Sequence, residues 1–199
     1  MDGSKGIKVI LLGESGVGKT NLINVSMGKE FDPNINSSLS TSFCDSQLEY
    51  DNKNYIYSLW DTAGQERFRS LNGIFIKGAK IVLIVFAIDN KNSFEQIDFW
   101  VNYAKDTLEN EKYILALIGN KYDLFEEQTI TDEEISQKVK ELNIQYKMTS
   151  AYTDADGFKE FLHGLIKEYI NLVGPDNSEE LYFTLKKQIQ EKPKKGFKC

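Results

Sequence analysis

The residues best suited to chemistry lie near the N-terminus, in the segment 13–20, which reads G-E-S-G-V-G-K-T. An apolar run, 9–12, precedes this segment, and a helical pattern follows it. The segment matches G-x-x-x-x-G-K-[ST], in which glycines let backbone N–H groups approach phosphate oxygens closely. The alternative is a turn that serves packing alone, and a chance match is expected in roughly one chain of this length in a hundred. The segment therefore predicts a site for a nucleoside polyphosphate.

Each residue of this phosphate loop has an expected role. We expect the phosphates to be contacted by Ser15, Gly16, Val17, Gly18, Lys19 and Thr20. Lys19 can reach the outer phosphates, where its charge would also assist phosphoryl transfer. Thr20 lies in the first turn of the following helix, where its hydroxyl can coordinate Mg²⁺. The nucleotide and its metal are thus expected to share one site.

Composition limits the other possibilities. The 199 residues are 41% hydrophobic and 27% charged, which is typical of one globular domain. The formal net charge of −6 disfavours nucleic acid as a partner, because its backbone requires a basic face. The two cysteines, Cys44 and Cys199, give no disulfide framework, and the longest apolar run, 81–88, is too short to span a membrane. We expect a cytosolic monomer.

Strand and helix patterns alternate along the chain. This order predicts an α/β fold with three layers, in which helices cover both faces of a six-stranded, mostly parallel sheet with one antiparallel strand. We expect a domain over residues 1–173 and a mostly disordered tail over 174–199. The predicted strands are 9–12, 43–51, 54–60, 80–88, 113–119 and 144–148, and the predicted helices are 20–27, 93–108, 131–142 and 154–173.

Further polar clusters follow the predicted strands. Ligands of such sheets lie at the carboxyl ends of the strands, where the sequence places Asp61 with Gly64, then the run Asn120, Lys121 and Asp123, and finally Ser150 with Ala151. The carboxylate of Asp123 offers two acceptors that suit the N1–H and the exocyclic amine of guanine, whereas adenine has no such donor pair. Taken alone, Asn-Lys-x-Asp is equally typical of an ordinary turn.

With these clusters and the run W-D-T-A-G-Q-E-R-F-R at residues 60–69, the chain resembles a small GTPase of the Ras superfamily, and the Rab branch most of all. The resemblance covers residues 6–173. It implies the P-loop GTPase fold, a cycle between GDP and GTP with Mg²⁺ bound, and a role in vesicle trafficking. It also implies an exchange factor, an activating protein and effectors as partners.

The resemblance assigns roles to individual residues. Asp61 would hold Mg²⁺ through a water, the Gly64 N–H would bind the γ-phosphate, and Gln65 would orient the attacking water, although Gln65 could also be a solvated loop residue. The guanine would be contacted by Phe31, Asn120, Lys121, Asp123, Ser150 and Ala151. Within this group Asn120 and Lys121 would connect their loop to the phosphate loop, and Ala151 would donate its N–H to the guanine O6. No arginine has an obvious place on the transferred phosphate, so intrinsic hydrolysis should be slow and should need an activating protein.

The sequence departs from the family pattern at two positions of the expected site. Ser38 stands where a threonine is usual, and it keeps the hydroxyl for Mg²⁺ and the N–H for the γ-phosphate but lacks a methyl group. One buried methyl is worth about 0.8 kcal/mol, so its absence should lower the ordered population of this loop roughly fourfold. We therefore expect a looser GTP-bound switch that still functions. Tyr152 stands where a lysine is usual. Its ring could pack against the base or ribose, or it could be a surface substitution.

Other residues point to partners. Phe43, Trp60 and Phe75 match an aromatic trio that presents the effector surface in Rab-like proteins, and core packing is the alternative role. Cys199 is one cysteine where Rabs usually carry two, and with Lys194, Lys195 and Lys198 it could support a prenylated, reversibly bound tail on the cytosolic face of an intracellular membrane. The alternative is an unmodified terminus. His163, the only histidine, is expected to be structural or exposed.

Two other functions are alternatives to a protein that switches between GDP-bound and GTP-bound states. Because Ser38 alters the loop that would bind Mg²⁺ and the γ-phosphate, the first switch loop, the protein could be a constitutively GTP-bound scaffold with negligible hydrolysis. An ATP-dependent kinase with the same phosphate loop is disfavoured by Asp123 and by the lack of a lid domain.

The role of Ser38 leads to a first prediction. The substitution Ser38→Ala removes the hydroxyl that we expect on Mg²⁺, so it should lower the Mg²⁺-dependent affinity for GTP and weaken the binding of partners to the GTP-loaded protein. Equilibrium binding of GTP with and without Mg²⁺ measures the effect. Unchanged GTP affinity and partner binding would remove Ser38 from the metal site and leave Ser37 or Ser40 as candidates.

Overall fold

The computed structural model describes residues 6–35, 42–62 and 74–174. The expectations for Ser38, Gly64, Gln65 and Cys199 lie outside these ranges. The described part contains the sheet, the helices that cover it and most of the expected nucleotide site.

The core element is a six-stranded sheet in the order β2-β3-β1-β4-β5-β6. Among the strands of the described residues, β2 and β3 alone pair in antiparallel orientation. The predicted α/β fold is therefore confirmed. The strands are β1 (Ile7–Leu12), β2 (Ser42–Tyr50), β3 (Lys53–Asp61), β4 (Ile81–Ala87), β5 (Ile114–Asn120) and β6 (Gln145–Met148).

The hairpin turns at Asp51 and Asn52, both at positive φ, one residue earlier than the sequence predicted. Asn and Asp tolerate this conformation, and two-residue turns of this kind match the twist of the two strands.

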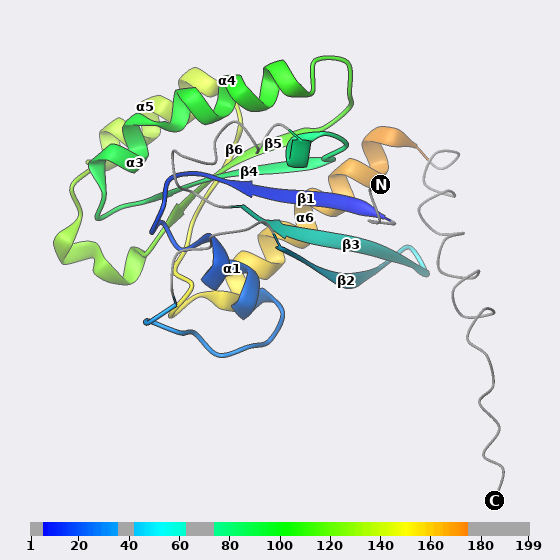
Figure 1. The fold of residues 1–199 in the computed structure, drawn as a ribbon, viewed down its shortest axis with the longest axis horizontal. Coiled ribbons are helices and arrows are strands. Elements are labelled where there is room, and N and C mark those ends of the chain that lie inside the picture. The colour runs from blue at the N-terminus through cyan, green and yellow to red at the C-terminus, as the bar shows by residue number, and fades with distance from the viewer. Residues whose placement is uncertain (1–5, 36–41, 63–73, 175–199) are drawn as a thin grey trace, which may run out of the picture.

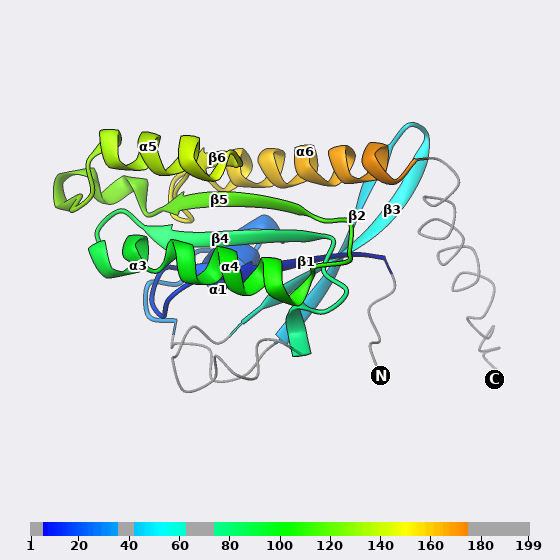
Figure 2. The ribbon, with the colours of Figure 1, turned by 90° about the horizontal axis from the view of Figure 1, so that it is seen from above.

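Helices cover both faces of the sheet (Figures 1 and 2). α1 (Lys19–Ser26) and α6 (Ala155–Val173) lie on one face, and α3 (Lys91–Glu95), α4 (Ile97–Thr107) and α5 (Asp132–Leu142) lie on the other. Successive residues of β1 alternate between the two cores. Val9 and Leu11 pack toward α1 and α6, whereas Ile10 and Leu12 pack toward α3, α4 and α5. This alternation follows from the two-residue period of a strand that is buried on both faces.

The structure corrects the prediction of one helix over residues 93–108. Asn90 accepts a hydrogen bond from the N–H of Ser93 at 3.0 Å, so a short helix, α3, already begins at Lys91. The backbone departs from ideal helical geometry at Gln96, with φ −84° and ψ 0°, and α4 begins at the next residue. The apolar stripe continues across this break, which explains why the sequence pattern did not reveal it. A 3₁₀ segment, η2 (Tyr122–Glu127), is too short to give a pattern of its own.

His163 of α6 has a structural contact. Its Nε2 lies 3.2 Å from the hydroxyl of Tyr57, which is fully buried in β3. Burial lowers the pKa of His163, and the neighbouring Lys159 and Lys167 lower it further. The contact joins α6 to the sheet.

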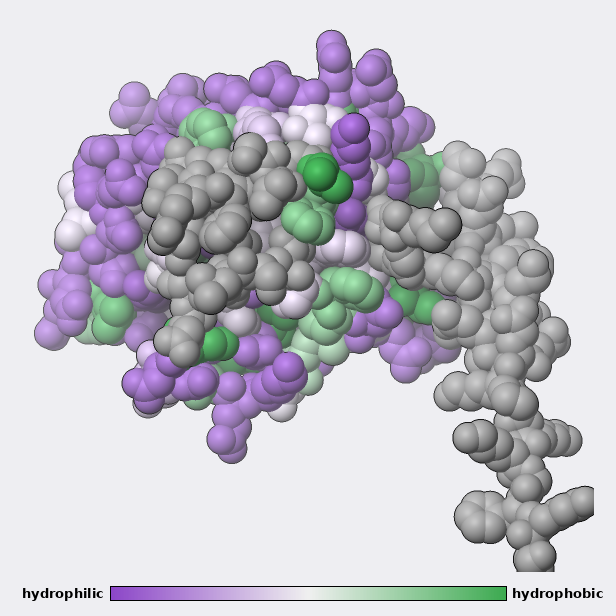
Figure 3. All heavy atoms as spheres, in the orientation of Figure 1, coloured by the Kyte–Doolittle hydropathy of each residue, from purple (hydrophilic) through white to green (hydrophobic). Residues whose placement is uncertain are grey.

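Hydrophilic side chains cover most of the outer surface along the α3, α4 and α5 side, with smaller hydrophobic areas between them (Figure 3). Across the described residues, none of the helices combines the length and the apolar character that crossing a membrane requires.

The capping box at the start of α5 gives a prediction about stability. The Thr131 hydroxyl accepts from the Glu134 N–H at 3.2 Å, and the Glu134 carboxylate accepts from the Thr131 N–H at 2.8 Å. Thr131→Ala should lower the free energy of unfolding by about 1 kcal/mol. Chemical denaturation at a fixed, saturating GDP concentration measures this change.

Ser136→Ala is the matched control, because Ser136 lies within the same helix, away from its ends, and is exposed to solvent. Alanine is a better helix former, so the control should leave stability unchanged or raise it slightly. Equal loss of stability in both variants would contradict a capping role for Thr131.

Candidate functional site

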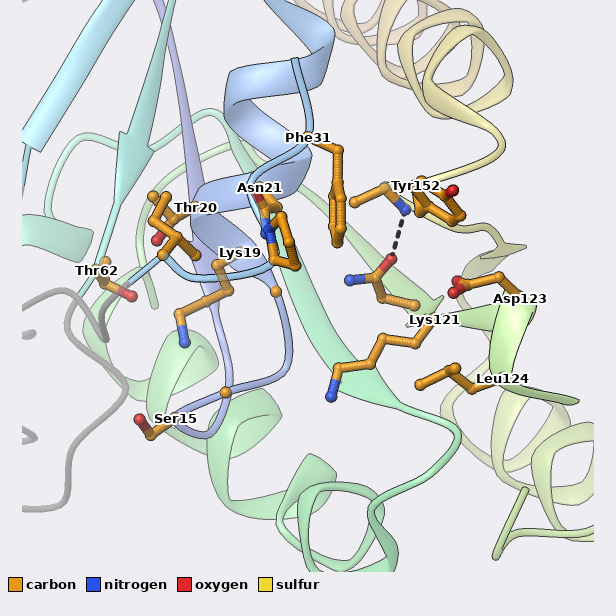
Figure 4. A pocket seen from close by; sticks show the side chains of 16 residues that line it. Ser15, Lys19, Thr20, Asn21, Phe31, Thr62, Lys121, Asp123, Leu124 and Tyr152 are labelled. Carbon is orange, nitrogen blue, oxygen red and sulfur yellow. Dashed lines mark hydrogen bonds between the residues drawn. The ribbon is translucent and has the colours of Figure 1, made fainter. Parts of the chain in front are cut away.

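The expected site is a cavity of about 670 Å³ at the carboxyl ends of the parallel strands. Figure 4 shows Ser15, Lys19, Thr20 and Thr62 at one end, and Phe31, Lys121, Asp123, Leu124 and Tyr152 at the other. Residues that are far apart in the sequence therefore meet around one elongated space. Of the expected contact residues, those that line it are Ser15, Gly16, Gly18, Lys19, Thr20, Phe31, Asn120, Lys121, Asp123, Ala151 and Tyr152.

Two glycines of the phosphate loop are required by its backbone. Gly13 has φ 143°, and a Cβ there would lie 2.1 Å from the carbonyl oxygen of Val85. Gly18 has φ 94°, and a Cβ there would lie 2.3 Å from Nδ2 of Asn120. A side chain at either position would combine strain with overlap. Val17, between them, packs its side chain into the core, so only its backbone can take part in the site.

Lys19 is held by its own loop. Its Nζ donates to the carbonyl oxygens of Gly13 at 2.9 Å and of Glu14 at 2.8 Å, and only 5% of the residue is exposed. Burial lowers the pKa of Lys19 to about 8, and the negative charges of Asp61 and Glu14 act against this shift. The loop thus places a poorly hydrated ammonium group at one end of the cavity.

Oxygen ligands for a hard cation meet beside Lys19. The Thr20 hydroxyl donates to Oδ2 of Asp61 at 2.7 Å, and Asp61 is 4% exposed. A hydroxyl and a carboxylate are ligands that fit Mg²⁺. Among the described residues, no group of three or more His, Cys, Asp or Glu side chains could hold a metal ion. Mg²⁺ at this position would therefore take other ligands from waters and from phosphate oxygens.

The Asn120 side chain joins two of the loops that surround the cavity. Its Nδ2 donates to the carbonyl oxygen of Val17 at 2.8 Å, and its Oδ1 accepts from the N–H of Ala151 at 3.1 Å. Asn120 is 1% exposed. The phosphate loop and the loop after β6 are therefore fixed relative to each other by one buried amide. The Ala151 N–H, which was expected on a guanine oxygen, is used in this connection.

Within the described residues, the Lys121 ammonium pairs with a carboxylate outside the phosphate loop. Its backbone is left-handed, with φ 65°, and its Nζ pairs with Oδ2 of Asp89 at 3.0 Å. Of Asn120 and Lys121, Asn120 is the one that hydrogen-bonds to the phosphate loop. The sequence could not show this difference, because Asp89 follows another strand, β4.

Ser150 holds Asp123 in position. The Ser150 hydroxyl donates to Oδ1 of Asp123 and accepts from the N–H groups of Tyr152 and Thr153 at 3.0 and 3.1 Å. Ser150 itself is buried and does not line the cavity. Its role in this geometry is to orient the Asp123 carboxylate and to shape the turn that carries Tyr152.

Aromatic rings form one wall at the same end. The rings of Phe31 and Tyr152 are 5.1 Å apart between centroids and inclined by 50°. The segment that carries Phe31 is attached to α1 through Asn21, which donates to the carbonyl oxygen of Asp32 at 2.9 Å and accepts from its N–H at 3.3 Å. The contact between the two rings therefore joins the segment after α1, which carries Phe31, to the segment after β6, which carries Tyr152.

Several residues of the site were missed by sequence reasoning. The cavity is also lined by Asn21, Pro33, Ile35, Thr62 and Leu124. Asn21 carried a usable signal, since it is a polar residue on the apolar side of a predicted helix. Thr62 directly follows Asp61, and its hydroxyl donates to the carbonyl oxygen of Leu11 at 2.7 Å. Trp100 also supports the loop, since its Nε1 donates to Oε1 of Glu14 at 3.1 Å, and no local pattern predicts that contact.

The expected effector trio forms a continuous row. Phe43 stacks on Trp60 with centroids 4.8 Å apart, and Trp60 contacts Phe75 at 6.3 Å. Trp60 is buried, with the Lys8 ammonium 4.1 Å from the centre of its ring, whereas Phe43 is 50% exposed. Core packing and surface presentation are thus combined in one cluster.

Comparison with known proteins agrees with this arrangement. Residues 8–171 match the Ras family. The Ras-related protein Rab-9A of Mus musculus is 33% identical over 198 residues, with 96% of each chain covered. The Ras-related protein Rab-9A of Canis lupus familiaris is 33% identical over 195 residues, again with 96% of each chain covered. The chain therefore belongs to the Ras family of small GTPases and is related to its Rab proteins.

Proposed function

We propose that this protein is a Rab-like molecular switch that binds GDP and GTP with Mg²⁺, hydrolyses GTP slowly and recruits effectors in intracellular vesicle trafficking. The observation that carries the proposal is that a phosphate loop and the Asp123 carboxylate lie at opposite ends of one cavity. A site with phosphate donors at one end and a paired acceptor at the other suits one whole guanine nucleotide.

At the base end, Asp123 would accept from the N1–H and the exocyclic amine of guanine. Ser150 would keep the carboxylate in its orientation through the hydroxyl contact described above. Asn120 would hold this loop against the phosphate loop, and the Lys121 stem and Phe31 would flank the base. Adenine, which lacks the donor pair, should bind poorly.

At the phosphate end, backbone N–H groups of residues 15–20 and the Lys19 ammonium would bind the phosphates. Thr20, Asp61 and Ser38 would hold Mg²⁺ directly or through water, and the ion would neutralise charge on the β- and γ-phosphates. Gly64 would bind the γ-phosphate, and Gln65 would orient the attacking water. These two residues and Ser38 lie outside the described residues, so their roles rest on the sequence alone.

The remaining parts of the proposal concern partners. Phe43, with Trp60 and Phe75 behind it, would offer an aromatic surface to effectors. An exchange factor and an activating protein would control the nucleotide state. Prenylation of Cys199 would attach the protein reversibly to the cytosolic face of an intracellular membrane.

A constitutively GTP-bound scaffold is the second candidate, because Ser38 replaces the usual threonine of the first switch loop. Single-turnover hydrolysis by the purified, GTP-loaded protein separates the two functions. Conversion of bound GTP to GDP, accelerated by an activating protein, supports the switch. Bound GTP that persists in both conditions supports the scaffold.

The base contacts are tested by Asp123→Asn. The amide replaces one acceptor with a donor, which suits the C2 carbonyl of xanthine better than the C2 amine of guanine. We expect GDP affinity to fall about 100-fold or more and the affinity for xanthosine diphosphate to rise. Competitive equilibrium binding measures both affinities.

Asp98→Asn is the matched control for this substitution. Asp98 forms an exposed ion pair with Lys138 at 2.9 Å between α4 and α5, so the control should leave both affinities unchanged. If Asp123→Asn kept the preference for GDP over xanthosine diphosphate, guanine recognition by Asp123 would be wrong.

The lowered pKa of Lys19 predicts that protons are taken up when the nucleotide binds. In the empty protein Lys19 has a pKa of about 8, and a bound phosphate favours its charged form and raises that pKa. The diphosphate is already ionised at pH 8, so roughly half a proton should be taken up per GDP at this pH, and affinity should fall as the pH rises through 8. Calorimetry in two buffers of different ionisation enthalpy measures the uptake. Zero uptake would contradict a rise in the pKa of Lys19 when the nucleotide binds.

A further inference from the structure

We propose that Tyr152 is a nucleotide-retention residue, whose ring packs with Phe31 across the base end of the cavity and slows the dissociation of the bound guanine nucleotide. The inference rests on the proposed function and adds a residue that sets the lifetime of the complex. It concerns the base end alone, so it is independent of hydrolysis.

The first observation is the position of the two rings. Phe31 and Tyr152 both line the cavity, and Figure 4 shows them side by side above Asp123 and Lys121. Their centroid distance of 5.1 Å and inclination of 50° fall in the range of favourable aromatic pairs. A base that contacts Asp123 would therefore lie beside a wall formed by both rings.

The second observation is that each ring is held by a separate anchor. The turn that carries Tyr152 is fixed by its N–H, which donates to the Ser150 hydroxyl at 3.0 Å, and that hydroxyl also holds Asp123. Phe31 is followed by Asp32, which is tied to α1 through Asn21. The ring contact therefore links two anchored segments at one wall of the cavity. The position of Tyr152 is coupled to that of the carboxylate that would bind guanine.

The third observation concerns exposure. Tyr152 is 65% exposed although its ring lies at the cavity. A planar purine held by Asp123 would cover part of this exposed ring, which adds contact area to the bound state. Departure of the base would then require loss of this contact. The ring provides this effect, and the hydroxyl group is not needed for it.

The experiment uses the full-length protein loaded with tritiated GDP in the presence of Mg²⁺. Dissociation is followed after addition of excess unlabelled GDP. Tyr152→Ala should release GDP about twofold to tenfold faster, the range that an aromatic pair contributes. Tyr152→Phe should keep the wild-type rate, because it retains the ring.

Tyr122→Ala is the matched control. Tyr122 is 52% exposed and lies in the neighbouring segment η2, but it lines a different pocket, between α5 and β6. This variant should release GDP at the wild-type rate. If Tyr122→Ala and Tyr152→Ala accelerated release equally, Tyr152 would act only through general loosening of the surface, and the proposal would be overturned.

A double mutant separates a ring pair from two independent contacts. If the rings act as a unit, Phe31→Ala combined with Tyr152→Ala should release GDP little faster than Phe31→Ala alone. Multiplicative effects would overturn the paired role. If the wild-type protein retained no GDP at all, the proposed function would fail. Retention of GDP with a wild-type rate in Tyr152→Ala would reject this inference alone.

Discussion

The side-chain amide of Asn120 is the interaction on which the geometry of the cavity depends. It connects the phosphate loop at Val17 with the loop after β6 at Ala151, and it is almost completely buried. A buried amide that loses its partners costs about 1–3 kcal/mol, so the two loops cannot separate without a substantial loss of stability. Gly18 has no side chain because that space is taken by the same amide. The distance between the phosphate end and the base end is therefore set by the protein before a ligand arrives.

Preorganisation of this kind extends to the charges. The Lys19 ammonium is kept in place by two carbonyl oxygens of its own loop, and Glu14 of that loop is in turn held by the indole of Trp100. At the other end, one serine hydroxyl orients the Asp123 carboxylate. An anion at one end and a donor pair at the other would each meet a group that is already aligned. Little reorganisation is then required on binding, which favours affinity.

Local sequence patterns predicted much of this protein. The buried strand before the phosphate loop and the helix that follows Thr131 each depend on residues close in sequence, and both are present as predicted. The residues that the sequence could not place are those whose partners are distant. Lys121 pairs with Asp89, and Tyr152 packs on Phe31, because the fold brings separate loops to one edge of the sheet. The break at Gln96 was missed since the apolar stripe runs through it unchanged.

The course of α6 has a practical consequence. This helix begins beside the loop that carries Tyr152, runs along the sheet, and ends at the other end of the sheet beside the β2–β3 hairpin, where Asn171 bonds to Tyr50 (Figures 1 and 2). Its 19 residues correspond to a length of about 28 Å. A fluorophore or an immobilising linker attached at Gly174 would thus lie far from the cavity. Protein fixed to a sensor surface in this way would keep its cavity open to solution for kinetic measurements.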